Sequence, residues 1–229
     1  MRKKVLLLAL TSVLMSLCVP AIAQNDYVDL GLSVKWGTVN MGTTELRPYG
    51  WYWTWADAMD IKTTDGSRLA SKAEWNELLD YCTWKWTEKG GKIGYLITST
   101  IDGYRDRSIF IPASGWLQDG NIKRQNSYGS YWTSTPGVQS GEQGAYGFNF
   151  MRDGSEWHSE NRYSEQSVRM VMPLSESELT DLSIEKGTLK MSQASVDRLN
   201  VTTADGKRIL NSACKWVSSD ENVVSVMDD

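Results

Sequence analysis

The chain has 229 residues, with 24 lysines and arginines against 28 aspartates and glutamates and a formal net charge of −4 at pH 7. This length suits one domain of ordinary size and a smaller second one. An acidic chain is a poor candidate for binding nucleic acid or an anionic membrane surface, so we expect neither as a partner.

The first 23 residues have the three parts of a secretory signal peptide. A basic stretch at 2–4 precedes an apolar run at 5–17, and an A-x-A site at 21–23 predicts cleavage before Gln24. The apolar run is too short for a stable membrane anchor, and no later run is long enough to insert in a membrane. Cleavage removes three basic and no acidic residues, which leaves 21 against 28 and a net charge of −7. We therefore expect a secreted, extracytoplasmic protein, at the cell surface or in the periplasm.

The aromatic composition is unusual, with 11 Trp and 10 Tyr against 3 Phe. Trp and Tyr combine a large apolar face with a polar group, and they stack on sugars and anchor interfaces. We therefore expect at least one exposed aromatic cluster. The two cysteines after the signal, Cys82 and Cys214, fall in different predicted domains, so no disulfide framework is expected.

The first elements after the signal are a strand and a short helix. Residues 27–36 alternate loosely, which predicts a strand. Trp51, Trp53 and Trp55 follow at period two, a spacing that would place all three on one face of a strand. From Trp55 the apolar spacing changes to i, i+3, i+4, which indicates a helix capped by Thr54.

A capping box gives the clearest local signal. The Ser71 hydroxyl can accept the amide of Glu74 while the Glu74 side chain reaches back to the start of the helix. The apolar positions that follow have helical spacing and predict its buried face: Trp75, Leu78, Leu79 and Cys82. Cys82 is then a core residue with no basic or His partner nearby in sequence, so we do not expect it to be catalytic.

Short strands and turns are predicted for the rest of the first domain, at 95–100, 108–112, 131–135, 145–151 and 166–172. Residues 24–173 thus indicate one α+β domain with two early helices and many late strands. Residues 174–180 are polar without apolar periodicity and are interpreted as a linker. Residues 181–229 predict an all-β second domain, with strands at 182–184, 187–191, 198–202, 215–217 and 223–226 and a hairpin turn at Asp205-Gly206.

Several segments of residues 26–173 occur in the order found in one family: YVDLGLSVKW at 27–36, YG at 49–50, RL at 68–69, KAEW at 72–75, CTWKW at 82–86, IFIPASG at 109–115, YWTST at 131–135 and SVR at 167–169. They resemble the Fibrobacter succinogenes major paralogous domain, which is abundant in secreted proteins of Bacteroidetes. The resemblance implies a C-type-lectin-like fold, related also to formylglycine-generating enzymes. Val39 stands where the family often has a cysteine, which is consistent with a free Cys82.

The last part resembles a bacterial immunoglobulin-like group 2 domain, through LSI at 182–184, KWVSSD at 215–220 and NVVSV at 222–226. Members of that family continue with a glycine and two more strands, whereas this sequence stops at Asp229. We expect the sequence to be a piece of a longer protein, the alternative being a half-domain completed by another chain. An incomplete sandwich would expose an unpaired edge.

No catalytic or metal-binding set is recognisable. His158 is the only histidine, neither Cys82 nor Cys214 has a Cys neighbour at metal spacing, and no serine lies in a G-x-S-x-G motif. The calcium-binding motifs of C-type lectins and the paired cysteines of formylglycine-generating enzymes are absent. Aspartates in turns, such as Asp119, offer oxygen ligands but more often bond their own backbone. We therefore expect no enzymatic activity, cofactor or metal.

Polar and aromatic side chains in the second half of the first domain remain as candidate ligand contacts: Trp116, Asp119, Tyr128, Tyr131, Trp157, Asn161, Arg162 and Tyr163. In the lectin-like folds that the resemblance implies, loops of this region form the ligand surface. Rings beside planar hydrogen-bonding groups suit a sugar or a peptide. Trp157 and Tyr163 are expected to be the most exposed, and Arg169 is interpreted as an ion-pair partner for a carboxylate.

Three functions are compatible with these features. The favoured hypothesis is a non-catalytic, adhesin-like binding protein that recognises a glycan or another surface protein. The second is a structural module of an envelope assembly with no small ligand. The third, least favoured, is a hydrolase acting on polysaccharide, which requires two carboxylates about 5 to 9.5 Å apart in a cleft.

Overall fold

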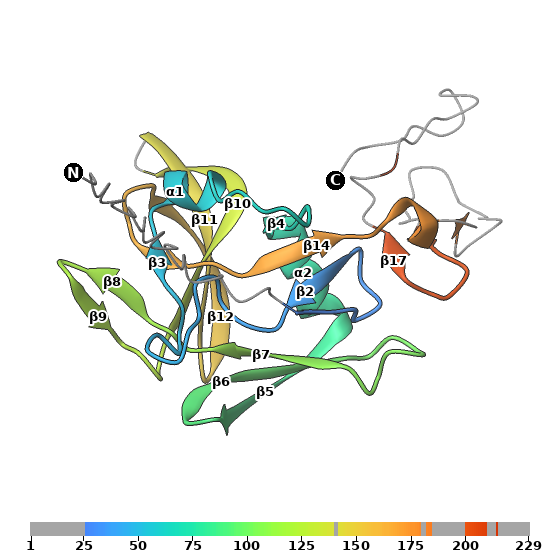
Figure 1. The fold of residues 1–229 in the computed structure, drawn as a ribbon, viewed down its shortest axis with the longest axis horizontal. Helices are drawn as coiled ribbons and strands as arrows, with labels where there is room; N and C mark the ends of the chain where they lie inside the picture. The colour runs from blue at the N-terminus through green and yellow to red at the C-terminus, as the bar shows by residue number, and fades with distance from the viewer. Residues whose placement is uncertain (1–25, 140–141, 180–181, 185–199, 210–213, 215–229) are drawn as a thin grey trace, which may run out of the picture.

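The computed structural model describes residues 26–139, 142–179, 182–184, 200–209 and 214. This part of the chain is built mostly of short strands with few helices, arranged in several small sheets (Figure 1). The arrangement is consistent with the predicted α+β class. The predicted signal peptide and the strands predicted at 187–191, 215–217 and 223–226 lie outside the described residues. No helix among the described residues is long and apolar enough to span a membrane.

Both predicted helix caps are confirmed. Helix α1 (Trp55–Met59) begins after Thr54, whose hydroxyl accepts the amide of Asp57 at 3.3 Å. Helix α2 (Lys72–Tyr81) begins with a complete capping box, because Ser71 accepts the Glu74 amide at 3.2 Å and the Glu74 carboxylate accepts the Ser71 amide at 2.7 Å. A short 3₁₀ helix, η1 (Glu176–Glu178), lies within the predicted linker.

The two ends of the first domain meet in one four-stranded sheet. Its strands, in spatial order, are β1 (Tyr27–Val28), β2 (Val34–Gly37), β14 (Met170–Pro173) and β4 (Arg68–Leu69). Strand β2 pairs antiparallel with β14, with Trp36 opposite Val171. The beginning and the end of the first domain, near Tyr27 and Pro173, therefore lie in the same sheet.

A five-stranded sheet forms the centre of the domain. Its strands, in spatial order, are β12 (Gly154–Asn161), β11 (Glu142–Met151), β10 (Gly129–Gln139), β13 (Gln166–Ser167) and β3 (Tyr52–Trp53). Tyr131, Phe148 and Trp157 occupy paired positions across β10, β11 and β12. Because side chains alternate between the two faces of a strand, all three lie on one face, which packs on the main core.

The remaining sheets are smaller and antiparallel. They consist of β5 (Cys82–Lys89), β6 (Lys92–Ser99) and β7 (Ser108–Pro112); of β8 (Trp116–Gln118) and β9 (Asn121–Lys123); and of β15 (Ser183–Ile184), β16 (Val201–Thr202) and β17 (Arg208–Ile209). The hairpin predicted at Asp205-Gly206 is present between β16 and β17. Strand β5 was not predicted, because the apolar pattern of α2 continues into Cys82 and hides the change of structure.

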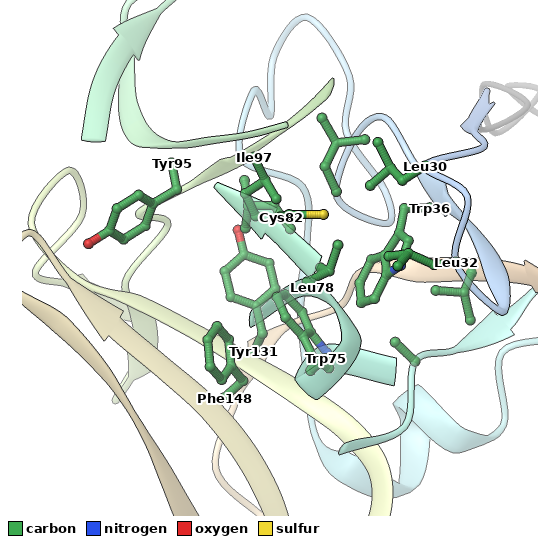
Figure 2. Packing of buried hydrophobic residues seen from close by; sticks show 14 of the residues in the cluster. Leu30, Leu32, Trp36, Trp75, Leu78, Cys82, Tyr95, Ile97, Tyr131 and Phe148 are labelled. Carbon is green, nitrogen blue, oxygen red and sulfur yellow. The ribbon is translucent and has the colours of Figure 1, made fainter. Parts of the chain in front are cut away.

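The main core is organised around Trp75 of α2 (Figure 2). Its ring packs edge-on against Trp36, with centroids 4.9 Å apart, and stacks on Phe148 at 4.7 Å. Tyr131 completes the group at 5.6 Å. Cys82 belongs to the same cluster, as predicted, and burial raises the pKa of its thiol to about 12. Such a thiol is a packing group rather than a nucleophile.

Arg169 is fully buried and links two sheets. Its guanidinium donates to the carbonyl oxygen of Gly37 at 2.9 Å, in β2, and to that of Phe110 at 3.0 Å, in β7. The expectation of a carboxylate partner was wrong: among the described residues, these carbonyl oxygens take its place. A planar guanidinium reaches two acceptors at once, which explains an arginine at this position.

Candidate functional site

The residues predicted to contact a ligand are divided by the fold into separate places. Trp116 and Tyr128 do meet, with ring centroids 5.4 Å apart in an edge-to-face arrangement. The guanidinium of Arg124 lies 4.8 Å from the centre of the Tyr128 ring. We call Trp116, Arg124 and Tyr128 the hairpin platform, because Trp116 begins β8 and Arg124 directly follows β9. Asp119 is exposed in the turn of this hairpin, where its φ of 51° is a left-handed conformation.

Two carboxylates of β12 face the hairpin platform. Burial raises the pKa of Tyr128, and the charges of Glu156 and Glu160 raise it further. The amide of Leu117 donates to the carbonyl oxygen of Glu165 at 3.0 Å and ties the hairpin to the sheet. The two predicted rings, Trp116 and Tyr128, therefore lie beside a guanidinium and two carboxylates that were not among the predicted site residues.

Tyr131 is a core residue, and the prediction that it contacts a ligand was wrong. Its side chain has no exposed surface, and its hydroxyl donates to the carbonyl oxygen of Pro112 at 2.6 Å and accepts from Asn40 at 3.0 Å. Trp157 is half-buried and not among the most exposed residues as expected, because the register of β11 and β12 turns its side chain toward the core. Its ring centroid lies 4.9 Å from that of Phe148.

The turn after β12 holds the other predicted residues. Tyr163 is 85% exposed, as expected. Asn161 accepts the amide of Tyr163 at 2.9 Å, which shapes the turn. Arg162 is tied down, because its guanidinium lies 4.2 Å from the Trp55 ring and its Nε donates to the Gly144 carbonyl oxygen at 3.0 Å. Arg162 therefore joins this turn to the start of α1.

A groove that was not predicted lies beside β3 and the end of α1. It has a volume of about 500 Å³, and we call it the Trp51–Trp53 groove. Its lining consists of Met41, Trp51, Tyr52, Trp53, Asp57, Asp60, Ile61 and Lys62. A smaller hollow of about 100 Å³ shares Ile61 with it. Concave sites with an aromatic wall and a few polar groups are typical ligand sites.

The Trp51 ring is held in place although it is 46% exposed. Gly42 packs against it so closely that an added Cβ would lie 2.0 Å from the ring. The Arg47 guanidinium lies 3.8 Å from the ring centre. Trp53 is the neighbouring ring, with centroids 6.4 Å apart and planes inclined by 37°. A wall that is ordered before binding loses less conformational entropy when a ligand arrives.

Two hydrogen-bond donors of the aromatic wall are buried or already bonded. The Nε1–H of Trp53 is buried and has no acceptor among the described residues. By contrast, the Tyr52 hydroxyl is committed to the carbonyl oxygen of Ser114 at 2.5 Å, and burial raises its pKa to about 12. Because the Trp53 N–H is shielded from solvent, a ligand in the groove cannot reach it in this structure.

Charged groups surround the aromatic wall. Asp57 accepts a hydrogen bond from the Thr54 hydroxyl at 2.6 Å, and Asp60 pairs with Lys62 at 2.7 Å. The hydrogen bond from Lys62 lowers the pKa of Asp60. The Asp60–Lys62 pair is exposed, so its ions remain hydrated and can exchange partners at little cost. The groove thus offers acceptors and a donor beside its rings.

The described part of the chain contains no group of three or more His, Cys, Asp or Glu side chains arranged to hold a metal ion. His158 lies 3.0 Å from Glu156 on the exposed face of β12.

Comparison with known proteins gives one partial match. The sequence profile of a domain of unknown function (DUF8237) matches residues 100–171. No curated protein and no solved structure matches the chain. The matched segment includes the hairpin platform and strands β10 to β13, whereas the residues that line the Trp51–Trp53 groove all precede it.

Proposed function

We propose that this chain is a secreted, non-catalytic protein that binds a glycan in the Trp51–Trp53 groove. The observation that carries the proposal is the groove itself: two fixed indole rings beside hydrated carboxylates and an ammonium group. The C–H faces of a pyranose ring pack on indole, and its hydroxyls bond to carboxylates and amines.

The proposal includes location and fold. Secretion is supported by the basic, apolar and A-x-A segments of residues 1–23. A C-type-lectin-like first domain is supported by the ordered family segments and by the closure of β2 on β14. An immunoglobulin-like second domain is supported by the antiparallel pairs β15–β16 and β16–β17.

The test is binding of the full secreted chain, from Gln24 onward, to a broad glycan array, followed by calorimetry on the best ligands. We expect Trp51→Ala to weaken binding at least fivefold, because stacking on an aromatic anchor typically contributes more than about 1 kcal/mol. Trp116→Ala is the matched control, since it removes a ring from the hairpin platform and leaves the groove intact.

The two variants separate the outcomes. Loss of binding with Trp51→Ala alone supports the groove. Loss with Trp116→Ala alone moves the site to the hairpin platform and contradicts the groove. Absence of any glycan binding by the parent chain contradicts the glycan proposal itself. Circular dichroism of each variant checks that the fold is retained.

One observation favours a protein ligand as the second candidate. Leu46 is 94% exposed and precedes Arg47, which stacks on Trp51 at the rim of the groove. Exposed apolar, arginine and tryptophan side chains together are typical of protein interfaces. Under this alternative, Leu46→Asp would abolish capture of a surface protein, whereas glycan binding has no need of Leu46.

A further inference from the structure

The hairpin of β16 and β17 packs against the first domain. The amide of Arg208 donates to the carbonyl oxygen of Gly31 at 2.9 Å. The hydroxyl of Tyr104 donates to the Asp205 carboxylate at 2.9 Å. In Figure 1, β17 lies beside the end of β14 and far from α1 and β3, which border the groove. The segment after the predicted linker thus contacts loops that are about a hundred residues or more away in sequence.

Lys207 lies at the centre of this contact. Its side chain is only 6% exposed, and its Nζ lies 3.0 Å from Glu178, 3.2 Å from Asp29 and 3.6 Å from Asp205. These carboxylates come from the first loop, from η1 and from the hairpin turn itself. Burial of an ammonium group is costly unless it is paired and hydrogen-bonded. Here the pairing is supplied by three separate parts of the chain.

Two further basic side chains near Lys207 offset the negative charge of the carboxylates. Lys35 pairs with Glu178 at 2.7 Å, and Arg107 lies 3.8 Å from Asp29. Burial opposes the charge of Lys207, but hydrogen bonds to Glu178 and Asp29 outweigh it and raise the Lys207 pKa. The pKa of Glu178 is lowered well below its usual range, because the hydrogen bonds from Lys35, Ser175 and Lys207 outweigh its burial. The charged forms are therefore the stable ones at neutral pH.

Arg208 adds a second attachment next to the first. Its guanidinium lies 3.9 Å from the centre of the Tyr81 ring, at the end of α2. A guanidinium over the face of an aromatic ring is attracted by the negative charge of that face. The hairpin therefore contacts the first loop, the Tyr104 loop, η1 and α2.

We infer that Lys207 locks the β16–β17 hairpin onto the first domain, so that residues 26–179 and 200–209 move and unfold as one body. A flexible linker at 174–180 would let the two parts move independently. The observed segment instead has Leu174 buried, forms η1 and contributes Glu178 to the lysine site. The first domain, with its groove, is then held in a fixed orientation relative to the hairpin.

The experiment is limited proteolysis and calorimetry of the full secreted chain and its Lys207→Met variant at pH 7.5. Methionine keeps the length and apolar stem of lysine and removes the charge. We expect cleavage within residues 174–182 to become about a hundredfold faster, because, among the described residues, the variant loses every ion pair that joins the hairpin to η1 and to the first loop, although Lys35 still pairs with Glu178. Arg105→Met is the matched control, since within the described part of the chain Arg105 pairs with exposed Asp102 alone and is itself exposed.

Two outcomes overturn the inference: equal cleavage rates in Lys207→Met and the parent, or two separate unfolding transitions in the parent chain. Tyr104→Phe provides a milder variant if Lys207→Met does not fold. It deletes only the hydroxyl that bonds to Asp205. A several-fold increase in cleavage supports the lock, and no increase in this variant contradicts it.

Discussion

The hydroxyl of Ser33 donates a hydrogen bond to the carboxylate of Glu77 at 2.6 Å, which ties the first loop of the domain to the middle of α2. The Ser33 amide also donates to it, at 3.3 Å. Glu77 is buried, and burial raises its pKa to about 7, although the Ser33 hydrogen bonds oppose this shift. The repulsion of Glu74 adds to the shift, and the nearby charge of Arg208 reduces it.

The raised pKa of Glu77 makes the free energy of unfolding depend on pH. Because its folded pKa lies above the ordinary value of 4.5, its contribution is fully present below pH 4.5 and is lost as pH rises through about 7. We expect Glu77→Gln to stabilise the fold by roughly 1 to 3 kcal/mol at pH 8 and to have little effect at pH 4.5. Urea unfolding at both values measures this difference, with exposed Glu88→Gln as control. An equal effect of Glu77→Gln at both values would contradict the assignment.

Trp75 is the side chain on which the main core depends most. It contacts Trp36, Tyr131 and Phe148, which come from three different strands. We expect Trp75→Ala to lower the free energy of unfolding by about 3–5 kcal/mol, since it removes a fully buried indole from a closed core. Trp51→Ala is the control, because that ring is 46% exposed and its removal leaves no closed cavity. Similar losses for the two variants would show that the core does not centre on α2.

Local signals made both helices predictable. The caps at Thr54 and Ser71 depend on residues within three positions of each other, so the sequence is sufficient to place them. Strand β7 was predicted with its observed bounds for the same reason: an apolar run flanked by turns is a local pattern.

The candidate site was less predictable, because it depends on contacts that are distant in sequence. Tyr131 and Trp157 looked like ligand contacts, but the register of β10, β11 and β12 turns both toward the core. The period-two spacing of Trp51 and Trp53 was visible, but the groove is also lined by Met41 and by residues 57–62, and their position beside the rings could not be predicted from local patterns. The role of Lys207 could not be predicted from the sequence, because the three carboxylates that contact it come from separate segments.

Replacing Arg169 by lysine tests whether a guanidinium is needed to link the sheets that contain β2 and β7. Its NH1 and NH2 donate to the carbonyl oxygens of Gly37 and Phe110. Lysine keeps the charge but has one nitrogen on a flexible stem, so it cannot reproduce both bonds with the same geometry. We expect Arg169→Lys to lower the free energy of unfolding by about 2 kcal/mol or more, because a buried carbonyl loses its donor. Thermal unfolding measures the effect, and a change below about 0.5 kcal/mol would contradict this account.

Replacing Gly42 by alanine tests whether ligand binding in the groove depends on the position of the Trp51 ring. An alanine Cβ at this position would lie 2.0 Å from the Trp51 ring, so the ring must move. The φ of Gly42 is 76°, a left-handed conformation that costs about 1–2 kcal/mol for alanine. Gly66 is the matched control, because its φ is 80° but an added Cβ would meet nothing within 4 Å.

Gly42→Ala and Gly66→Ala therefore share the backbone cost and differ only in the collision with Trp51. We expect comparable losses of stability from the left-handed backbone in both. Only Gly42→Ala should shift the tryptophan fluorescence and weaken glycan binding in the groove. Equal binding by the two variants, with altered fluorescence in Gly42→Ala, would mean that the ligand does not use the Trp51 ring. Unchanged fluorescence in Gly42→Ala would instead contradict the close packing of Gly42 against that ring.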